Sequence, residues 1–186
     1  MFRSALIVGL SLILSSCLSS TEIDMKRAKK LLERKKPAEA AALYESVAKR
    51  ENSRTGGAVH SAAASLEAGK IYQYDLKKFD DAIRNYRNVI AWSSDAEARR
   101  DAQVKVAGLL FYDVQDFKAA VAEYSKLISL QHTLPEEIEW RGRIARAYYY
   151  MGNYFQSGIE VDRLLTLAMG VDEEAVYQAY LLKANI

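Results

Sequence analysis

The sequence is poor in the residues that catalytic and metal sites need most. It has one cysteine and two histidines in 186 residues, so no disulfide forms within the chain. Neither His60 nor His132 has a cysteine or an acidic cluster at metal-ligand spacing. The loop Thr55-Gly56-Gly57 lacks the Gly-x-x-x-x-Gly-Lys-Ser/Thr frame that holds phosphate groups, and no carboxylate pair stands out as catalytic. We therefore predict a protein that is not an enzyme and takes no metal, cofactor or small-molecule substrate.

Proline and net charge are scarce as well. Only Pro37 and Pro135 occur, while alanine, leucine, glutamate, lysine and arginine dominate, and these residues favour helix. The formal net charge is +2, and removal of Arg3 with a signal peptide lowers it to +1. A general nucleic-acid binder usually carries a strong basic excess, so we expect no nucleic-acid partner. The composition predicts an all-α domain large enough to bury a core.

A long hydrophobic run is absent except at the start of the chain. Arg3 precedes the uncharged, mostly apolar segment 4–14, and the small residues Ser15 and Ser16 follow. This is the three-part order of a secretory signal. The apolar run is shorter than the roughly 20 residues that a membrane-spanning helix needs. We predict that residues 1–16 are a cleaved signal peptide.

The only cysteine stands directly after this segment. Leu14-Ser15-Ser16-Cys17 resembles the bacterial lipobox, in which an aliphatic residue and two small residues precede the cysteine. The resemblance implies cleavage before Cys17, acylation of its thiol with a fatty acid such as palmitate, and a short tether over residues 17–21. Leu18 replaces the aspartate that favours inner-membrane retention, which implies the outer membrane of a Gram-negative bacterium, on its periplasmic face. The alternative is an ordinary secretory peptide that happens to contain a cysteine.

The remaining chain carries a pattern that occurs four times. A small residue is followed four positions later by a tyrosine or valine and three positions after that by an aliphatic residue, which places the three on one helix face. The four sets are Ala40-Tyr44-Val47, Ala82-Tyr86-Val89, Ala120-Tyr124-Leu127 and Ser157-Val161-Leu164. The small residues are 42, 38 and 37 positions apart. The preceding segments add the pairs Ala28 with Leu31, Gly69 with Tyr72, Gly108 with Phe111, and Ala145 with Tyr148.

These residues resemble the tetratricopeptide repeat (TPR), a helix-turn-helix unit of about 34 residues. The resemblance implies a right-handed α-solenoid of about four such repeats over residues 22–186, with a C-terminal capping helix from Asp172 to about Ala184. We expect one extra residue in the second repeat, between Tyr72 and Phe79, and most of the other excess length in the first linker. The alternative is a helical bundle with accidental similarity.

Several helix ends are marked by capping residues. Ser94 with Glu97, and Thr133 with Glu136, each have the spacing of a capping box. Gly170 is suited to end one helix, and Asp172 is suited to cap the next. These signals support the division into helices that the repeat pattern predicts.

The first helix of each pair lines the concave surface of such a stack, and this surface binds proteins or peptides. We predict that the groove is formed by side chains that lie off the buried stripe. They are Lys70, Gln73, Tyr74, Lys105, Leu109, Tyr112, Asp113, Arg146, Tyr149 and Tyr150. Tyrosine and arginine are enriched in interface hot spots, although several of these tyrosines could instead pack between repeats. Successive helical positions are about 100° apart, so we expect Tyr148 in the core and at least one of Tyr149 and Tyr150 exposed.

The resemblance implies a scaffold that binds envelope proteins. Similar acylated repeat proteins serve the β-barrel assembly machine and, as pilotins, secretin or pilus assembly. The alternatives are an adaptor that regulates cell-wall enzymes or the Tol-Pal system, and a structural subunit of a larger envelope complex. Some TPR proteins hold a C-terminal carboxylate with Lys and Asn, but Leu109 stands where the second polar residue is needed. The basic segment Lys26–Lys36 is either a lipid-facing surface or a solvated helix face.

Overall fold

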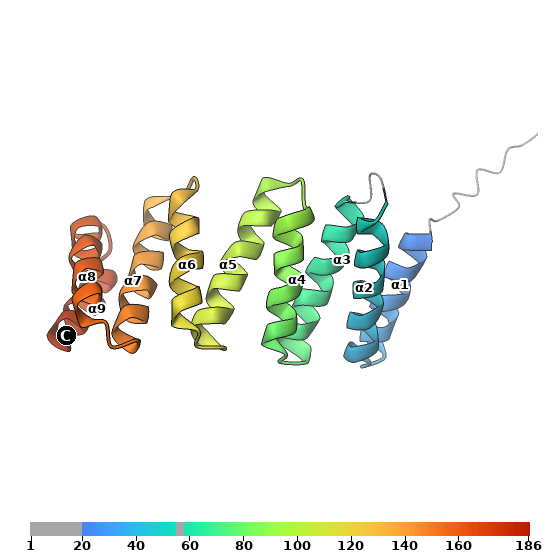
Figure 1. Ribbon diagram of the computed structural model, residues 1–186, viewed down its shortest axis with the longest axis horizontal. Helices are drawn as coiled ribbons and strands as arrows, with labels where there is room; N and C mark the ends of the chain where they lie inside the picture. Colours follow the sequence, from blue (N-terminus) through green and yellow to red (C-terminus); the bar gives the residue numbers. More distant parts are fainter. Residues whose placement is uncertain (1–19, 55–57) are drawn as a thin grey trace, which may run out of the picture.

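The structure, a computed structural model, describes residues 20–54 and 58–186. Over these ranges the helices are stacked along one long axis in the order of the chain (Figure 1). The helices are α1 (Ser20–Glu33), α2 (Pro37–Asn52), α3 (Ala58–Lys70), α4 (Phe79–Trp92), α5 (Ala96–Tyr112), α6 (Phe117–Ser129), α7 (Leu134–Tyr150), α8 (Tyr154–Ala168) and α9 (Glu173–Ala184). A π-helical turn, Ile71–Asp75, continues α3. The predicted signal peptide, Cys17 and the middle of the first linker lie outside the described residues.

The helices form four antiparallel pairs and a cap. Each helix contacts the helices before and after it in the chain, and α9 contacts both α7 and α8. The first helices of the pairs are α1, α3, α5 and α7, and the second helices are α2, α4, α6 and α8. The stack runs from α1 at one end to α8 and α9 at the other (Figure 1). This confirms an all-α solenoid of four repeats with a capping helix.

The predicted stripe on the second helices is the core of every pair. Ala40, Ala82, Ala120 and Ser157 are fully buried, and the tyrosines Tyr44, Tyr86 and Tyr124 are buried four residues later. In the last pair the Ser157 hydroxyl donates a hydrogen bond to the Ala145 carbonyl at 2.8 Å, which joins α8 to α7. The small residues let the paired helices approach closely, and the large residues fill the space beside them.

The turn inside each pair repeats one backbone conformation. Its central residue has a left-handed φ, of 58° at Lys35, 54° at Lys77, 59° at Gln115 and 73° at Gly152. These four residues are separated by 42, 38 and 37 positions, the same intervals as the second-helix stripe. The left-handed region favours glycine, yet only the last turn has one.

The register of the first helices differs from the prediction in one repeat. Ala107, not Gly108, is the buried small residue of α5, while Gly108 is partly exposed and has no atom within 4 Å of an ideal Cβ. The burial pattern of α3 recurs in α5 and again in α7 at an interval of 38 residues. The buried small residues of the four first helices are therefore Ala28, Gly69, Ala107 and Ala145.

This register gives the second and third repeats one extra residue each, not the second alone. Gly69 and Ala82 are 13 positions apart, as are Ala107 and Ala120, whereas Ala145 and Ser157 are 12 apart. Both repeats take up the extra residue just before the turn, with a hydrogen bond that reaches back five residues. The amide of Leu76 donates to the carbonyl of Ile71 at 3.0 Å, and that of Val114 to Leu109 at 2.9 Å.

Most predicted caps are present. The Thr133 amide donates to the Glu136 carboxylate at 2.8 Å, and Asp172 accepts from the Ala175 amide at 2.9 Å. Gly170 follows α8 with a φ of 76°. The cap of α5 is Asp95, which accepts from the Glu97 amide at 3.0 Å, so the capping box predicted for Ser94 is wrong by one residue.

Candidate functional site: the face of the first helices

The 38-residue interval places three tyrosines at equivalent positions on successive first-helix segments. Tyr74, Tyr112 and Tyr150 each lie two or three residues before a left-handed turn residue, and they are 55%, 54% and 56% exposed. We call these residues the tyrosine row. Three large aromatic side chains at the same position and with the same exposure are not needed by the core, so the row is available to a partner.

Packing holds two members of the row in place. The Tyr150 ring lies 5.0 Å from the Phe117 ring and 6.3 Å from the Phe111 ring, measured between centroids. The Arg143 Nε donates a hydrogen bond to the Tyr112 hydroxyl at 2.9 Å, and the Arg143 guanidinium lies 5.4 Å from the centre of the Tyr112 ring. The two rings are thus presented in fixed positions, which lowers the entropy cost of binding.

A cation lies over the buried tyrosine at two successive junctions between repeats. Lys105 Nζ is 5.9 Å from the centre of the Tyr86 ring, and the Arg143 guanidinium is 5.6 Å from the centre of the Tyr124 ring. Burial raises the pKa of Tyr124 to about 12, so it is neutral beside the cation at physiological pH. Arg143 also pairs with Glu139. These cations therefore have structural partners.

Arg146 differs from every other half-buried arginine in the described part of the chain. The others each make an ion pair or a hydrogen bond, as Arg141 does with Glu137 at 2.7 Å and Arg100 with Glu136 at 2.6 Å. No hydrogen bond, ion pair or ring contact within the described ranges involves Arg146. A partly desolvated guanidinium with five free donors is a ready site for a carboxylate.

Two pockets meet at Arg146 and Tyr150. One, of about 600 Å³, lies between α5 and α7 and is lined by Phe111, Tyr112, Gln115, Phe117, Arg146 and Tyr150. The other, of about 420 Å³, lies between α7 and α9, where Leu164, Leu181 and Leu182 form part of its wall. The first is mainly aromatic and the second mainly aliphatic, so both suit apolar side chains on either side of a charged group.

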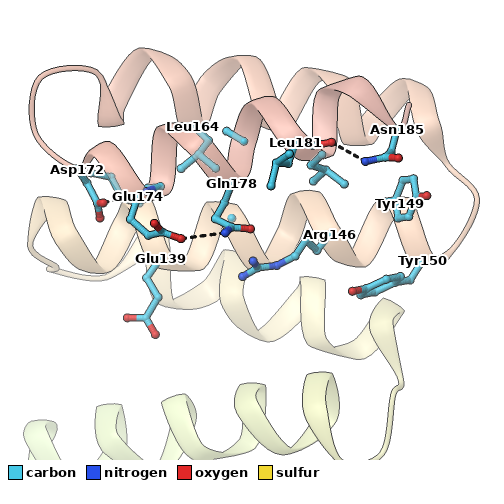
Figure 2. A pocket seen from close by; sticks show the side chains of 15 residues that line it. Glu139, Arg146, Tyr149, Tyr150, Leu164, Asp172, Glu174, Gln178, Leu181 and Asn185 are labelled. Atoms are coloured by element: carbon cyan, nitrogen blue, oxygen red, sulfur yellow. Dashed lines mark hydrogen bonds between the residues drawn. The ribbon is translucent and has the colours of Figure 1, made fainter.

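The two ends of the pocket beside α9 differ in charge. Figure 2 shows Arg146, Tyr149 and Tyr150 toward one end and Glu139, Asp172 and Glu174 toward the other. The acids already have partners: Asp172 caps α9, and Glu174 accepts from the Gln178 amide at 2.8 Å. Arg146 is the group in this pocket that is still open to a charged ligand.

The structure places most of the predicted groove residues on this face. Tyr74, Tyr112, Asp113 and Tyr150 are exposed, and Lys70, Gln73, Lys105, Arg146 and Tyr149 are half-buried. Two of the half-buried residues have internal roles: Lys70 pairs with Glu67 at 2.6 Å, and Gln73 accepts a hydrogen bond from the Tyr86 hydroxyl at 2.7 Å.

One predicted groove residue is wrong. Leu109 is only 1% exposed and belongs to the central core with Val106 and Leu110. α5 has neighbours on both flanks, so its buried surface is wider than the single stripe assumed from the sequence. The groove-facing position next to it is Gly108, the equivalent of Lys70 and Arg146. Tyr148 does pack against the central core and Tyr150 is exposed, as predicted.

Arg143, Glu139 and the α9 residues Leu181 and Leu182 belong to the face and were not predicted. The 38-residue interval is the signal that would have identified Arg143, as the equivalent of Lys105. No such signal exists for α9, because it is not part of a repeat.

Within residues 20–54 and 58–186, no group of three or more His, Cys, Asp or Glu side chains is placed to hold a metal ion. No helix in the same ranges has the length and apolar character needed to cross a membrane.

Comparison with known proteins supports the repeat fold. No family model and no curated sequence matches the chain. Among solved structures, the nearly identical TPR-like repeats of a kinesin light chain of Podosopora anserina superpose with a TM-score of 0.57 at 15% identity. The match covers 88% of this chain and 86% of that one. MamA gives a TM-score of 0.52 at 16% identity, over 85% of this chain and 95% of that one. The chain has a TPR-like fold.

Proposed function

We propose that this protein is an outer-membrane lipoprotein that binds protein partners on the face of its first helices, as a scaffold in an envelope assembly machine. The observation that carries the proposal is the tyrosine row next to the unpartnered Arg146. Tyrosine and arginine are enriched among the few hot-spot residues that dominate the binding energy of protein interfaces. The two pockets beside Arg146 give apolar side chains of a partner a place to be buried.

The membrane part of the proposal comes from the lipobox at Cys17. Acylation at this residue would hold the solenoid by the end at which α1 lies, since α1 begins three residues later at Ser20. Stable anchoring takes two acyl chains, or one chain and a second membrane contact. Replacement of Cys17 by Ala should abolish palmitate labelling and release the protein from the outer-membrane fraction. Palmitate labelling that persists in this variant would contradict the anchor.

The partner class is tested by photocrosslinking in living cells. A photoreactive residue at Tyr150 reports on the tyrosine row, and one at Tyr177 is the matched control, since Tyr177 is an equally exposed tyrosine on α9. We expect an adduct from Tyr150 and none from Tyr177. A β-barrel protein or a secretin in the adduct supports the assembly role.

Other adducts would redirect the proposal. A cell-wall enzyme or a Tol-Pal component in the Tyr150 adduct would favour the adaptor function over assembly. An adduct from Tyr177 with none from Tyr150 would contradict the binding face itself.

A further inference from the structure

The positive charge of the chain is concentrated at the start of the solenoid. Residues 26–36 carry seven cations and one acid, whereas residues 37–186 carry 18 cations and 21 acids. The basic segment comprises most of α1 and the turn that follows it. A local excess of one sign attracts a surface or a partner of the opposite sign.

These cations are not neutralised within the protein. Lys36 pairs with Glu39 at 2.8 Å, and no other cation of the segment forms an ion pair in the described ranges. In residues 37–186, by contrast, 11 of the 18 cations are ion-paired. The six exposed, unpaired cations are called the basic face, and they are Lys26, Arg27, Lys29, Lys30, Arg34 and Lys35. An anion that binds to this face breaks no existing ion pair.

The helical part of the basic face is the outer half of an amphipathic helix. Ala28 is fully buried, and Met25, Leu31 and Leu32 pack against the core of the first repeat. At about 100° per residue, the cations of α1 lie on the opposite half of the helix. α1 is the end of the stack, so no helix in the described part of the chain covers this half (Figure 1).

An exposed aliphatic side chain on the same half favours a lipid surface over a purely polar anion. Ile23 is 53% exposed and stands three and four residues before Lys26 and Arg27, so the three are neighbours on the helix surface. Helices that lie on anionic membranes place apolar side chains at the headgroup boundary and cations among the phosphates. Ile23 and the basic face provide both kinds of group.

The position of α1 in the chain favours the same occupant. α1 begins at Ser20, three residues after Cys17, and three residues span at most about 11 Å. The acyl chain of the proposed function would therefore keep the basic face beside the lipid headgroups. A site held so close to its ligand binds at a high effective concentration.

We propose that the basic face of α1 lies on anionic phospholipid headgroups and forms a second membrane contact beside the acyl chain. The proposal rests on the proposed function for the anchor and deepens it by giving the solenoid an orientation. The α1 end lies at the membrane and the α9 end away from it. Asp172, Glu173 and Glu174 lie at the start of α9, at the far end of the stack, and an anionic surface repels them (Figure 1).

The test measures vesicle binding of the full-length chain with Cys17→Ala, which removes the acyl chain. One set of vesicles is phosphatidylcholine alone, and the other contains about 30% phosphatidylglycerol as the anionic lipid. The readout is the ratio of the two partition coefficients, in which the contribution of residues 1–16 to neutral binding cancels. Each cation close to an anionic membrane raises the affinity about fivefold, so six cations should give a ratio of about a thousand or more. The ratio should approach one in about 1 M salt, where the Debye length is about 3 Å.

Variants assign the ratio to the basic face. Replacing Lys26, Lys29 and Lys30 together by Gln should lower it about a hundredfold, since three cations are lost. The matched control replaces three other exposed cations that form no ion pair in the described ranges, and these are Lys77, Lys78 and Lys118. The control has the same net charge and should keep the ratio within about twofold of the parent. Circular dichroism of both variants verifies that the helices remain folded.

Three results would overturn the proposal: a parent ratio near one, an unchanged ratio in the α1 variant, or an equal loss in the control variant. A parent ratio near one together with binding to purified peptidoglycan would assign the basic face to the cell wall. The measured chain lacks Cys17, so the result does not depend on the acyl anchor. A failed vesicle test with Cys17-dependent palmitate labelling removes this inference alone, whereas palmitate labelling that persists in Cys17→Ala removes the proposed anchor.

Discussion

The second and third repeats have the same length and the same extra residue, yet they pack their buried tyrosine in different ways. In the second repeat, Gly69 lies against the Tyr86 ring, and the Tyr86 hydroxyl donates to Gln73 at 2.7 Å. In the third, the equivalent of Gly69 is Ala107 and the equivalent of Gln73 is Phe111. The Tyr124 hydroxyl is buried without a hydrogen-bond partner among the described residues.

The third repeat compensates with aromatic contacts. The Phe111 ring lies 6.4 Å from the Tyr124 ring and 5.7 Å from the Phe117 ring, in edge-on geometry. The buried tyrosine is thus packed in two ways: against a glycine with a hydrogen bond to Gln73 in the second repeat, and against aromatic rings in the third. The comparison teaches that identical positions in a repeat do not predict identical responses to substitution.

The largest expected difference is in the change of stability when Gly69 and Gly108 are each replaced by alanine. A Cβ at Gly69 would lie 2.9 Å from the Tyr86 ring, so Gly69→Ala should destabilise the chain by about 1–3 kcal/mol through overpacking. Gly108→Ala meets no atom within 4 Å and should stabilise the chain by up to about 1 kcal/mol, the difference in helix propensity. Urea denaturation of both variants measures this. Equal signs would contradict the register in which Gly69 lies against the Tyr86 ring and Gly108 lies outside the buried contact.

A smaller difference is expected for the tyrosine hydroxyls. Tyr86→Phe removes the hydrogen bond to Gln73 and should cost about 1 kcal/mol. Tyr124→Phe removes a buried hydroxyl that has no partner among the described residues and should be neutral or slightly stabilising. The pair is compared by thermal unfolding at one pH. A cost at Tyr124 as large as that at Tyr86 would show that its hydroxyl has a partner after all.

The smallest effect is a pH dependence at the junction of the third and fourth repeats. The Leu130 carbonyl at 2.7 Å and the Glu137 carboxylate at 3.0 Å raise the pKa of His132. The Arg100 guanidinium lowers the pKa of Glu136 to about 2. His132 therefore stabilises the fold below its unfolded pKa of about 6.5, and this contribution is lost as the pH rises through its folded pKa. The contribution of Glu136 is lost as the pH falls from about 4.5 to about 2.

Each contribution should be below about 1 kcal/mol, because both groups are in contact with solvent. The measurement is the urea midpoint of the wild type and of His132→Gln between pH 5 and pH 9. The wild type should lose stability above neutral pH, and the variant should not. A parallel loss in the variant would assign the pH dependence to another group.

The sequence was sufficient for the second helices because each has a small residue and a large residue at fixed spacing, and both must be buried. It was insufficient for α5, where Ala107 and Gly108 are both small and only the packed structure shows which faces α4 and α6. That ambiguity misplaced Leu109 and hid the extra residue of the third repeat.

The candidate site was predicted in part for the same reason. Tyr74, Tyr112 and Tyr150 were all among the predicted groove residues, but their equivalence depends on the 38-residue interval, which the wrong register obscured. The isolation of Arg146 could not be predicted at all. Glu139 and Glu174 line the same pocket as Arg146, and only the three-dimensional arrangement shows that they pair elsewhere.

The left-handed turns have a consequence for how far this solenoid can be stabilised. Lys35, Lys77 and Gln115 hold a conformation that costs a residue with a Cβ about 1–2 kcal/mol, and glycine is free of that cost. Three of the four turns thus lower the free energy of unfolding relative to a turn with glycine at the same position. The fold has an unused reserve of stability at these three positions, and the reserve lies at the ends of the helix pairs, where glycine could be introduced without changing a single side chain of the tyrosine row.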